Sequence, residues 1–178
     1  KSALMASFKI WSMIGNNRRT EALKFVDSTP TNDSWKSFMR GQIYAETGNA
    51  KRAAEEFARV RCDFMNINDY RYIMSFYIHN DMNDAADALR RDFTSHLGGM
   101  YMLEYTDIPA WENFAGTKNA MAFSLVQTVS HTQIMMYSDL SLLMLRFAEI
   151  TGPNFGDNND AINYYLGQFF FNNGGDYQ

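Results

Sequence analysis

The fold is decided by the stretch WKSFMRGQIYAETGNAKRAAEEFARV, which spans residues 35–60. Its apolar residues recur at helical spacing on both sides of Gly48, which predicts two helices joined by a tight turn. Glycine accepts the left-handed backbone conformation in which helices commonly end. Gly41 and Ala53 are small enough to let the two helices approach closely, so the stretch predicts a helical hairpin.

Three aromatic residues indicate that this hairpin is repeated. Trp11, Tyr44 and Tyr77 lie 33 residues apart, and each precedes a predicted turn. A fixed period of this size is typical of stacked helical hairpins. The predicted turns lie at Gly15-Asn16, Gly48-Asn49 and Asp81-Met82, and the first is about two residues longer than the second. We therefore expect hairpins at about residues 3–27, 34–62 and 67–95.

The stretch 35–60 resembles a tetratricopeptide (TPR) repeat. The residues that match the family pattern are Gly41, Tyr44, Gly48-Asn49, Ala53 and Phe57. The resemblance implies an all-α fold, an α-α superhelix of stacked antiparallel helix hairpins. Residues 1–96 would form three TPR-like hairpins, of which the second matches the pattern best.

The rest of the chain departs from the repeat period. Residues 97–117 are predicted to form an aromatic-rich loop, because Gly98-Gly99 breaks the preceding helix. Residues 118–178 are predicted to form further helices, either two helices or one long helix kinked near His131. Leu140, Leu143, Met144 and Phe147 form an apolar stripe at helical steps in this part. Residues 163–177 resemble the first helix and turn of another TPR-like repeat, so we expect the chain to be a fragment of a longer protein.

Composition narrows the class of protein. The 178 residues are 46% hydrophobic and 15% aromatic, which is enough for a buried core and argues against disorder. The net charge is -4 and no basic cluster exceeds two residues, which argues against nucleic acid as the partner. The longest apolar candidate, residues 135–150, is too short and too polar to span a membrane. Neither cytoplasm nor cell envelope is favoured as the location.

The sequence contains no pattern typical of a catalytic or metal site. His79, His96 and His131 are scattered, and none is spaced with another His or Cys as zinc ligands are. Cys62 is the single cysteine, and no neighbouring residue marks it as a nucleophile. No glycine-rich loop follows a predicted strand. We therefore expect a chain that is not an enzyme and that binds no metal, nucleotide or other cofactor.

The resemblance implies a groove lined by the first helix of each hairpin, where a protein or peptide partner would bind. The family's groove positions that carry binding-type side chains are Lys9, Trp35, Phe38, Gln42, Arg71 and His79. Trp35 and Phe38 also belong to an apolar helical stripe, so a position in the core is an open alternative. Trp111, in the aromatic stretch, is the next candidate for a binding residue.

A second interpretation of the same sequence is a helical accessory or glycan-binding segment of a larger cell-envelope protein. Similar superhelices precede the catalytic domains of soluble lytic transglycosylases, and helical repeats frame glycan-binding lipoproteins of the SusD type. The aromatic residues between Tyr101 and Phe114 would suit stacking on sugar rings. The sequence alone does not distinguish this function from that of a scaffold.

Overall fold

The computed structural model of the chain describes residues 3–96, 107–131, 139–152 and 160–172. Every regular element within these ranges is helical, which confirms the prediction of an all-α fold. In chain order the elements are α1 (Ala3–Gly15), α2 (Arg19–Ser28), α3 (Asp33–Glu46), α4 (Ala50–Phe57), α5 (Ile67–His79), α6 (Asn83–His96), the short 3-10 helix η2 (Trp111–Asn113), α7 (Thr117–His131), α8 (Asp139–Thr151) and α9 (Asp160–Asn172). None of the described helices combines the length and apolar character needed to cross a membrane.

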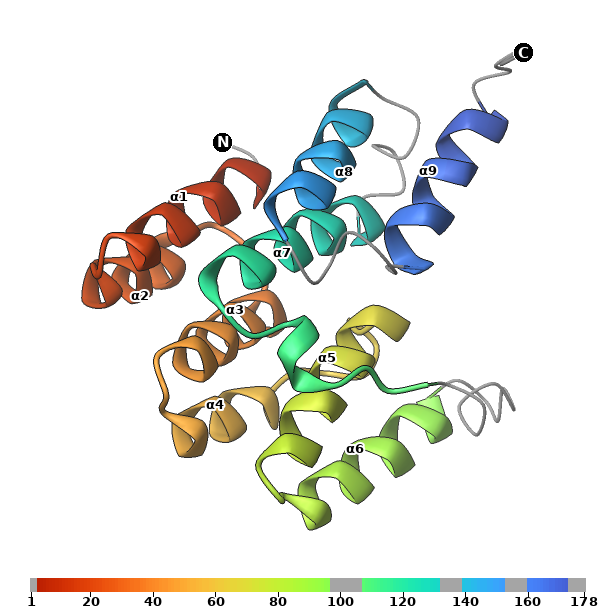
Figure 1. The fold of residues 1–178 in the computed structure, drawn as a ribbon. Helices are drawn as coiled ribbons and strands as arrows, with labels where there is room; N and C mark the ends of the chain where they lie inside the picture. Colours follow the sequence, from red (N-terminus) through yellow and green to blue (C-terminus); the bar gives the residue numbers. More distant parts are fainter. Residues whose placement is uncertain (1–2, 97–106, 132–138, 153–159, 173–178) are drawn as a thin grey trace.

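The first six helices pair into three hairpins, α1 with α2, α3 with α4, and α5 with α6 (Figure 1). Their bounds agree with the predicted hairpins to within a few residues, except that α4 ends at Phe57 and not near residue 62. Each of α3, α4 and α5 begins after an asparagine whose side chain accepts a backbone N–H of the first turn, which satisfies one of the free donors there. These asparagines are Asn32, Asn49 and Asn66.

The turns inside the three hairpins share one geometry. Each contains a residue in the left-handed region, Asn17 (φ 58°), Gly48 (φ 74°) and Asp81 (φ 56°). The next residue donates its N–H to a carbonyl five positions earlier, as in the Schellman ending of a helix. These bonds are Arg18 to Met13 (2.8 Å), Asn49 to Tyr44 (2.8 Å) and Met82 to Tyr77 (2.9 Å). The third turn therefore needs no glycine, because aspartate tolerates this conformation.

The first turn corrects the alignment expected from the sequence. Gly15 is the last residue of α1, and Asn17 takes the position that Gly48 has in the second hairpin. Counted from the turn, Met13 is therefore the equivalent of Tyr44, and Trp11 lies two residues further into its helix. The two extra residues noted in the first turn account for this difference.

Gly41 is the point of closest approach within the second hairpin. A Cβ atom on Gly41 would lie 2.4 Å from Cε1 of Phe57, closer than real Cβ atoms come to another carbon. Phe57 is 1% exposed. Its ring contacts those of Phe38, Tyr72, Phe76 and Tyr77 at centroid distances of 5.9, 6.0, 5.1 and 6.5 Å. Phe57 therefore joins the second hairpin to the third.

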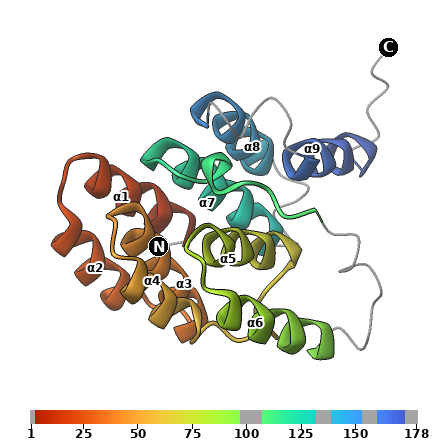
Figure 2. The same ribbon diagram turned by 60° about the horizontal axis from the view of Figure 1, so that its bottom comes forward.

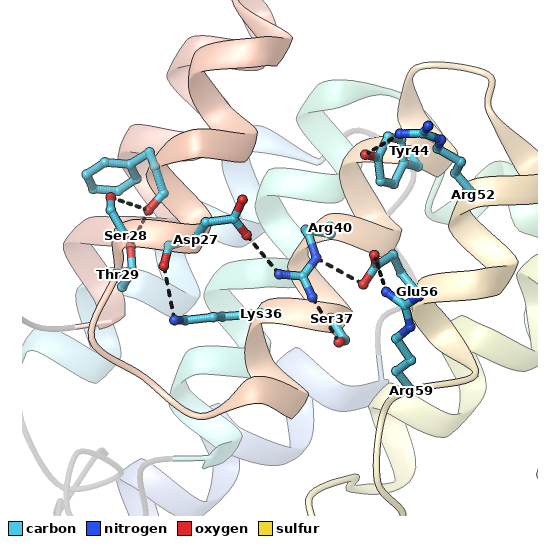
Figure 3. A network of polar contacts seen from close by, with 11 residues as sticks. Asp27, Ser28, Thr29, Lys36, Ser37, Arg40, Tyr44, Arg52, Glu56 and Arg59 are labelled. Atoms are coloured by element: carbon cyan, nitrogen blue, oxygen red, sulfur yellow. Dashed lines mark hydrogen bonds and ion pairs between the residues drawn. The ribbon is translucent and has the colours of Figure 1, made fainter.

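A polar link joins the first hairpin to the second (Figure 3). Arg40 on α3 reaches Asp27 on α2 through Nη1 (2.8 Å) and Glu56 on α4 through Nε (2.9 Å). Glu56 also pairs with Arg59 (2.9 Å) and has a side chain only 12% exposed. Because the Arg40–Glu56 pair is largely shielded from water, it is held more strongly than an ordinary surface pair.

The helices after residue 116 do not continue as a simple row of hairpins. α7 pairs with α8, but it also packs against α1 and α3, near the opposite end of the chain. Figure 2 shows α7 on the side of α1 and α5 that faces away from α2 and α6. α9 packs against α8 and α7. In a strictly linear array each repeat contacts only its neighbours, so the contact between α1 and α7 is a departure from that scheme.

Substituting alanine at two helical glycines is expected to have opposite effects. Gly41→Ala should lower the free energy of unfolding by about 1–3 kcal/mol, because the new methyl group overlaps the buried ring of Phe57. Gly167→Ala, on α9, should raise it by about 0.5–1 kcal/mol, because nothing lies within 4 Å of the new atom and alanine favours helix. Urea titration of both variants measures the difference. A stable Gly41→Ala protein would show that the close contact with Phe57 is absent.

Candidate functional site

The groove predicted from the sequence is the face shared by α1, α3 and α5, and α7 occupies it. One polar side chain from each of these three helices makes a side-chain hydrogen-bond contact with α7. These three residues are Trp11 on α1, Gln42 on α3 and Asp69 on α5. The chain's own helix therefore lies where a partner was expected.

Ser124 of α7 connects two of the inner helices. Its Oγ accepts a hydrogen bond from Nε1 of Trp11 (2.7 Å) and donates one to Oε1 of Gln42 (3.3 Å). All three side chains are buried. Nε2 of Gln42 and the hydroxyl of Tyr72 are both enclosed, and neither makes a hydrogen bond of good geometry with a described residue. Burial raises the pKa of Tyr72 well above its ordinary value and the nearby carboxylate of Glu46 adds to this effect, while the neighbouring side chain of Gln42 opposes it.

Asp69 is the most extensively bonded buried charge on this face. It is 1% exposed and accepts hydrogen bonds from Nε2 of Gln127 (2.9 Å) and from the backbone N–H of Asn66 (3.0 Å). Nε2 of His131 lies 2.6 Å from its second oxygen, and the His131 ring stacks on Phe64 with 4.6 Å between centroids. Asp69 thereby joins the start of α5 to the end of α7.

The Asp69–His131 pair has the geometry in which a carboxylate orients a histidine. The polar groups around the pair are bonded to one another. The neighbouring Ser130 donates to the carbonyl of Gln127 (2.8 Å) and accepts from Asn66 (2.7 Å), so its hydroxyl is held within the network. Among the residues that the structure describes, no three His, Cys, Asp or Glu side chains are grouped so that they could hold a metal ion. No sequence pattern indicates this pair, because its members are 62 positions apart.

A short segment covers the remaining part of the inner face. Residues 107–113, which we name the strap, run along α5 just before α7 (Figure 1). Nε of Arg71 donates to the carbonyl of Asp107 (2.9 Å), and Nδ1 of His79 lies 3.9 Å from a carboxylate oxygen of Glu112. Between these contacts the indole of Trp111 packs edge-on against Tyr72 (5.3 Å) and Phe76 (5.5 Å).

The strap does not fill the space beneath it. A cavity of about 230 Å³ remains between the strap and α5, and its walls are Ser75, Ile78, His79, Ile108, Pro109, Ala110, Trp111 and Glu112. Ser75 is 2% exposed, and no described residue forms a hydrogen bond with its Oγ. A buried hydroxyl without a partner is costly, so the cavity combines empty space with an unsatisfied polar group.

The structure separates the predicted binding residues into three groups. Trp35, Phe38 and Gln42 are buried. For Trp35 and Phe38 this is the core position that the sequence left as an alternative, and for Gln42 it corrects the expected place in an open groove. α7 covers Phe38 through Phe123 and Gln42 through Ser124. Lys9 is exposed, with its ammonium 4.3 Å from the centre of the Phe25 ring on α2.

The remaining predicted residues, Arg71, His79 and Trp111, lie together. His79 and Trp111 share the walls of the cavity, with ring centroids 6.2 Å apart, and Arg71 holds the start of the strap. Residues predicted from two separate parts of the sequence therefore lie close together in the structure. Tyr101 and Tyr105, which were part of the same aromatic stretch, lie outside the described residues.

An exposed apolar face lies on α8. The predicted stripe divides in two, because Met144 is buried with Leu145 and Ala148 while another row points outward. The outward residues, with their exposed fractions, are Leu140 (38%), Leu143 (52%), Phe147 (46%) and Ile150 (80%). Phe147 also meets Phe8 of α1 edge-on, with 6.5 Å between centroids. Apolar surface of this kind on one helix face is typical of an interaction site.

Glu46 sits at the junction between the strap and α7. Its carboxylate accepts the backbone N–H of Gly116 (3.0 Å), the residue before the first turn of α7. Burial raises the pKa of Glu46 to about 7, although the hydrogen bond from Gly116 opposes the shift. This carboxyl group therefore changes its charge near neutral pH at the point where α7 begins.

Asp69→Ala should lower the free energy of unfolding by about 2–4 kcal/mol, because it leaves the buried donors of Gln127 and Asn66 without an acceptor. Asp87→Ala serves as the matched control, since Asp87 is exposed and makes a surface pair with Arg90. That change should stay within about 0.5 kcal/mol. Equal urea midpoints for the two variants would contradict the role assigned to Asp69.

Glu46→Gln should stabilise the protein above neutral pH and leave it unchanged at pH 4. A carboxyl group whose pKa is raised by folding favours the folded state below its unfolded pKa, and this contribution is lost as pH rises through the folded value of about 7. Because Glu46 is half-buried, we expect a gain of about 1–2 kcal/mol at pH 8. Thermal unfolding of both proteins at pH 4, 6 and 8 gives the comparison. A difference that does not change with pH would refute the prediction.

Comparison with known proteins found no relative of this chain. No family model matches the chain, no curated protein matches it, and no solved structure matches it. The function is therefore inferred from the residues and geometry described above.

Proposed function

We propose that this chain is a non-catalytic helical-repeat scaffold of the TPR-like type, which binds a protein or peptide partner. The observation that carries the proposal is the outward apolar row of α8, Leu140, Leu143, Phe147 and Ile150. The face is apolar along about three helical turns and is left uncovered by the described part of the chain.

The local geometry of the hairpins supports the comparison with TPR repeats. The three hairpin turns share one left-handed position and one hydrogen-bond pattern. The second hairpin also has the close contact between a small residue and an aromatic ring, at Gly41 and Phe57, that the family pattern implies. The position of α7 distinguishes this chain from an open array, because the inner face is already covered.

The apolar row of α8 fits a helical partner segment. Its residues are spaced three and four positions apart, which is the spacing at which one amphipathic helix packs on another. Arg146 and Glu149 form an ion pair (2.8 Å) beside the row, which supplies the polar rim common at interfaces. The partner would therefore bring an apolar helix face with leucine-sized or aromatic side chains.

A glycan-binding role has weaker support. Such sites use aromatic rings whose faces are open to a sugar, and Trp111 is half-buried against Tyr72 and Phe76. The apolar row on α8 consists of Leu, Phe and Ile side chains, and the neighbouring Arg146 and Glu149 are paired with each other. We therefore place protein binding ahead of the alternative of a glycan-binding or accessory segment of a cell-envelope protein.

Replacing both Leu143 and Ile150 by glutamate should abolish partner binding without unfolding the protein, because both side chains are exposed and the change puts charge in an apolar interface. Ile67→Glu is the control, since Ile67 is 40% exposed on a different helix, α5. The measurement is a quantitative pull-down from the source organism with each tagged protein, followed by sedimentation to detect self-association. A captured partner that the double variant retains would rule out the α8 surface.

A further inference from the structure

We infer that the groove on α5 beneath the strap is a second binding surface, which takes an extended peptide segment carrying a tryptophan beside carboxylates. The strap, whose sequence is DIPAWEN (residues 107–113), occupies this groove as an intramolecular stand-in for that segment. This surface is separate from the one on α8, and the inference does not depend on the α8 proposal.

The contacts of the strap show what the groove recognises. Arg71 binds a main-chain carbonyl at one end, and His79 lies near a carboxylate at the other. The rings of Tyr72 and Phe76 pack against Trp111, the largest side chain of the strap. A groove with a cation at one end, an aromatic seat in the middle and an imidazole at the other end matches an acidic segment anchored by tryptophan.

The polar contacts at the two ends of the strap are weak, so the packing of Trp111 against Tyr72 and Phe76 supplies most of its hold. The Arg71–Asp107 hydrogen bond is exposed, and the side chains of His79 and Glu112 are 48% and 70% exposed at a separation of 3.9 Å. Exposed contacts of this kind contribute little. By contrast, α7 is held through hydrogen bonds whose side chains are buried. A competing segment therefore has to replace mainly the packing of Trp111, whereas displacement of α7 would also leave buried polar groups unpaired.

The fit of the strap is also incomplete. The cavity of about 230 Å³ lies between the strap and α5 and is partly open to solvent. Within the described part of the chain nothing bonds to the buried Oγ of Ser75 on its wall, and an unsatisfied buried hydroxyl reduces stability. An external segment with a larger residue than Ala110 at the corresponding position, and with a polar group that reaches Ser75, would occupy the groove more completely than the strap does.

The test uses a fluorescein-labelled DIPAWEN peptide and fluorescence anisotropy. In the wild-type chain the strap competes at a high effective concentration, so binding should be weak. Trp111→Ala removes the anchor of the strap, and this variant should bind the peptide at least about tenfold more tightly than the wild type does, since more of the protein has an open groove. The peptide should also raise the melting temperature of the variant.

Several controls make the outcome decisive. In the Trp111→Ala background, adding Arg71→Glu should reduce binding at least about fivefold, whereas adding Arg91→Glu, on the exposed side of α6, should leave it unchanged. A peptide with alanine in place of tryptophan should not bind. If Trp111→Ala fails to fold, the milder Ile108→Ser variant replaces it, since this change loosens the strap and keeps Trp111. Its affinity for the peptide is then compared with that of the wild type in the same way.

Two results would overturn the inference. One is a folded strap variant that binds the peptide no more tightly than the wild type does, and the other is binding that Arg71→Glu leaves unchanged. The Leu143→Glu/Ile150→Glu protein should bind the peptide as its parent does, because α8 is not part of the groove. Loss of partner capture through α8 and loss of peptide binding at α5 are therefore independent outcomes.

Discussion

The position of α7 against α1, α3 and α5 is the constraint on which the rest of the structure depends. Three buried polar side chains contact α7, one from the first helix of each hairpin. They are Trp11, Gln42 and Asp69. Because buried polar groups are costly when unpaired, these contacts set the position of α7 as well as stabilising it. The covered inner face, the place of the strap and the outward row of α8 all follow from this arrangement.

The inner face of the three hairpins is covered, so a partner would not bind there as it would in an open repeat array. In an open array the first helices of the hairpins would present their side chains to a partner. In this chain that surface is divided between α7, which is packed as core, and the strap, which rests on α5 over a cavity. The two surfaces proposed for binding have different chemistry, one apolar and helical on α8, the other aromatic and polar beneath the strap.

Glu46 is a titratable group at the junction between the strap and α7. Glu46 has a pKa raised to about 7 by burial and holds the N–H of Gly116, directly before α7. The strap ends and the buried helix begins at this place. A change in the charge of Glu46 therefore acts where the weakly held and the firmly held parts of the chain meet.

The three hairpins follow from local signals in the sequence: the left-handed turn at Gly48, the asparagine caps, and the small residue at Gly41 opposite Phe57. Arg71, His79 and Trp111 were also predicted as candidate binding residues from the sequence, but their proximity was not. The position of α7 depends on long-range contacts, since Trp11 and Ser124 are 113 positions apart and no periodic pattern links them. For the same reason, whether Phe38 or Phe147 faced the core could not be read from helical spacing, which places side chains on a face but does not say what covers it.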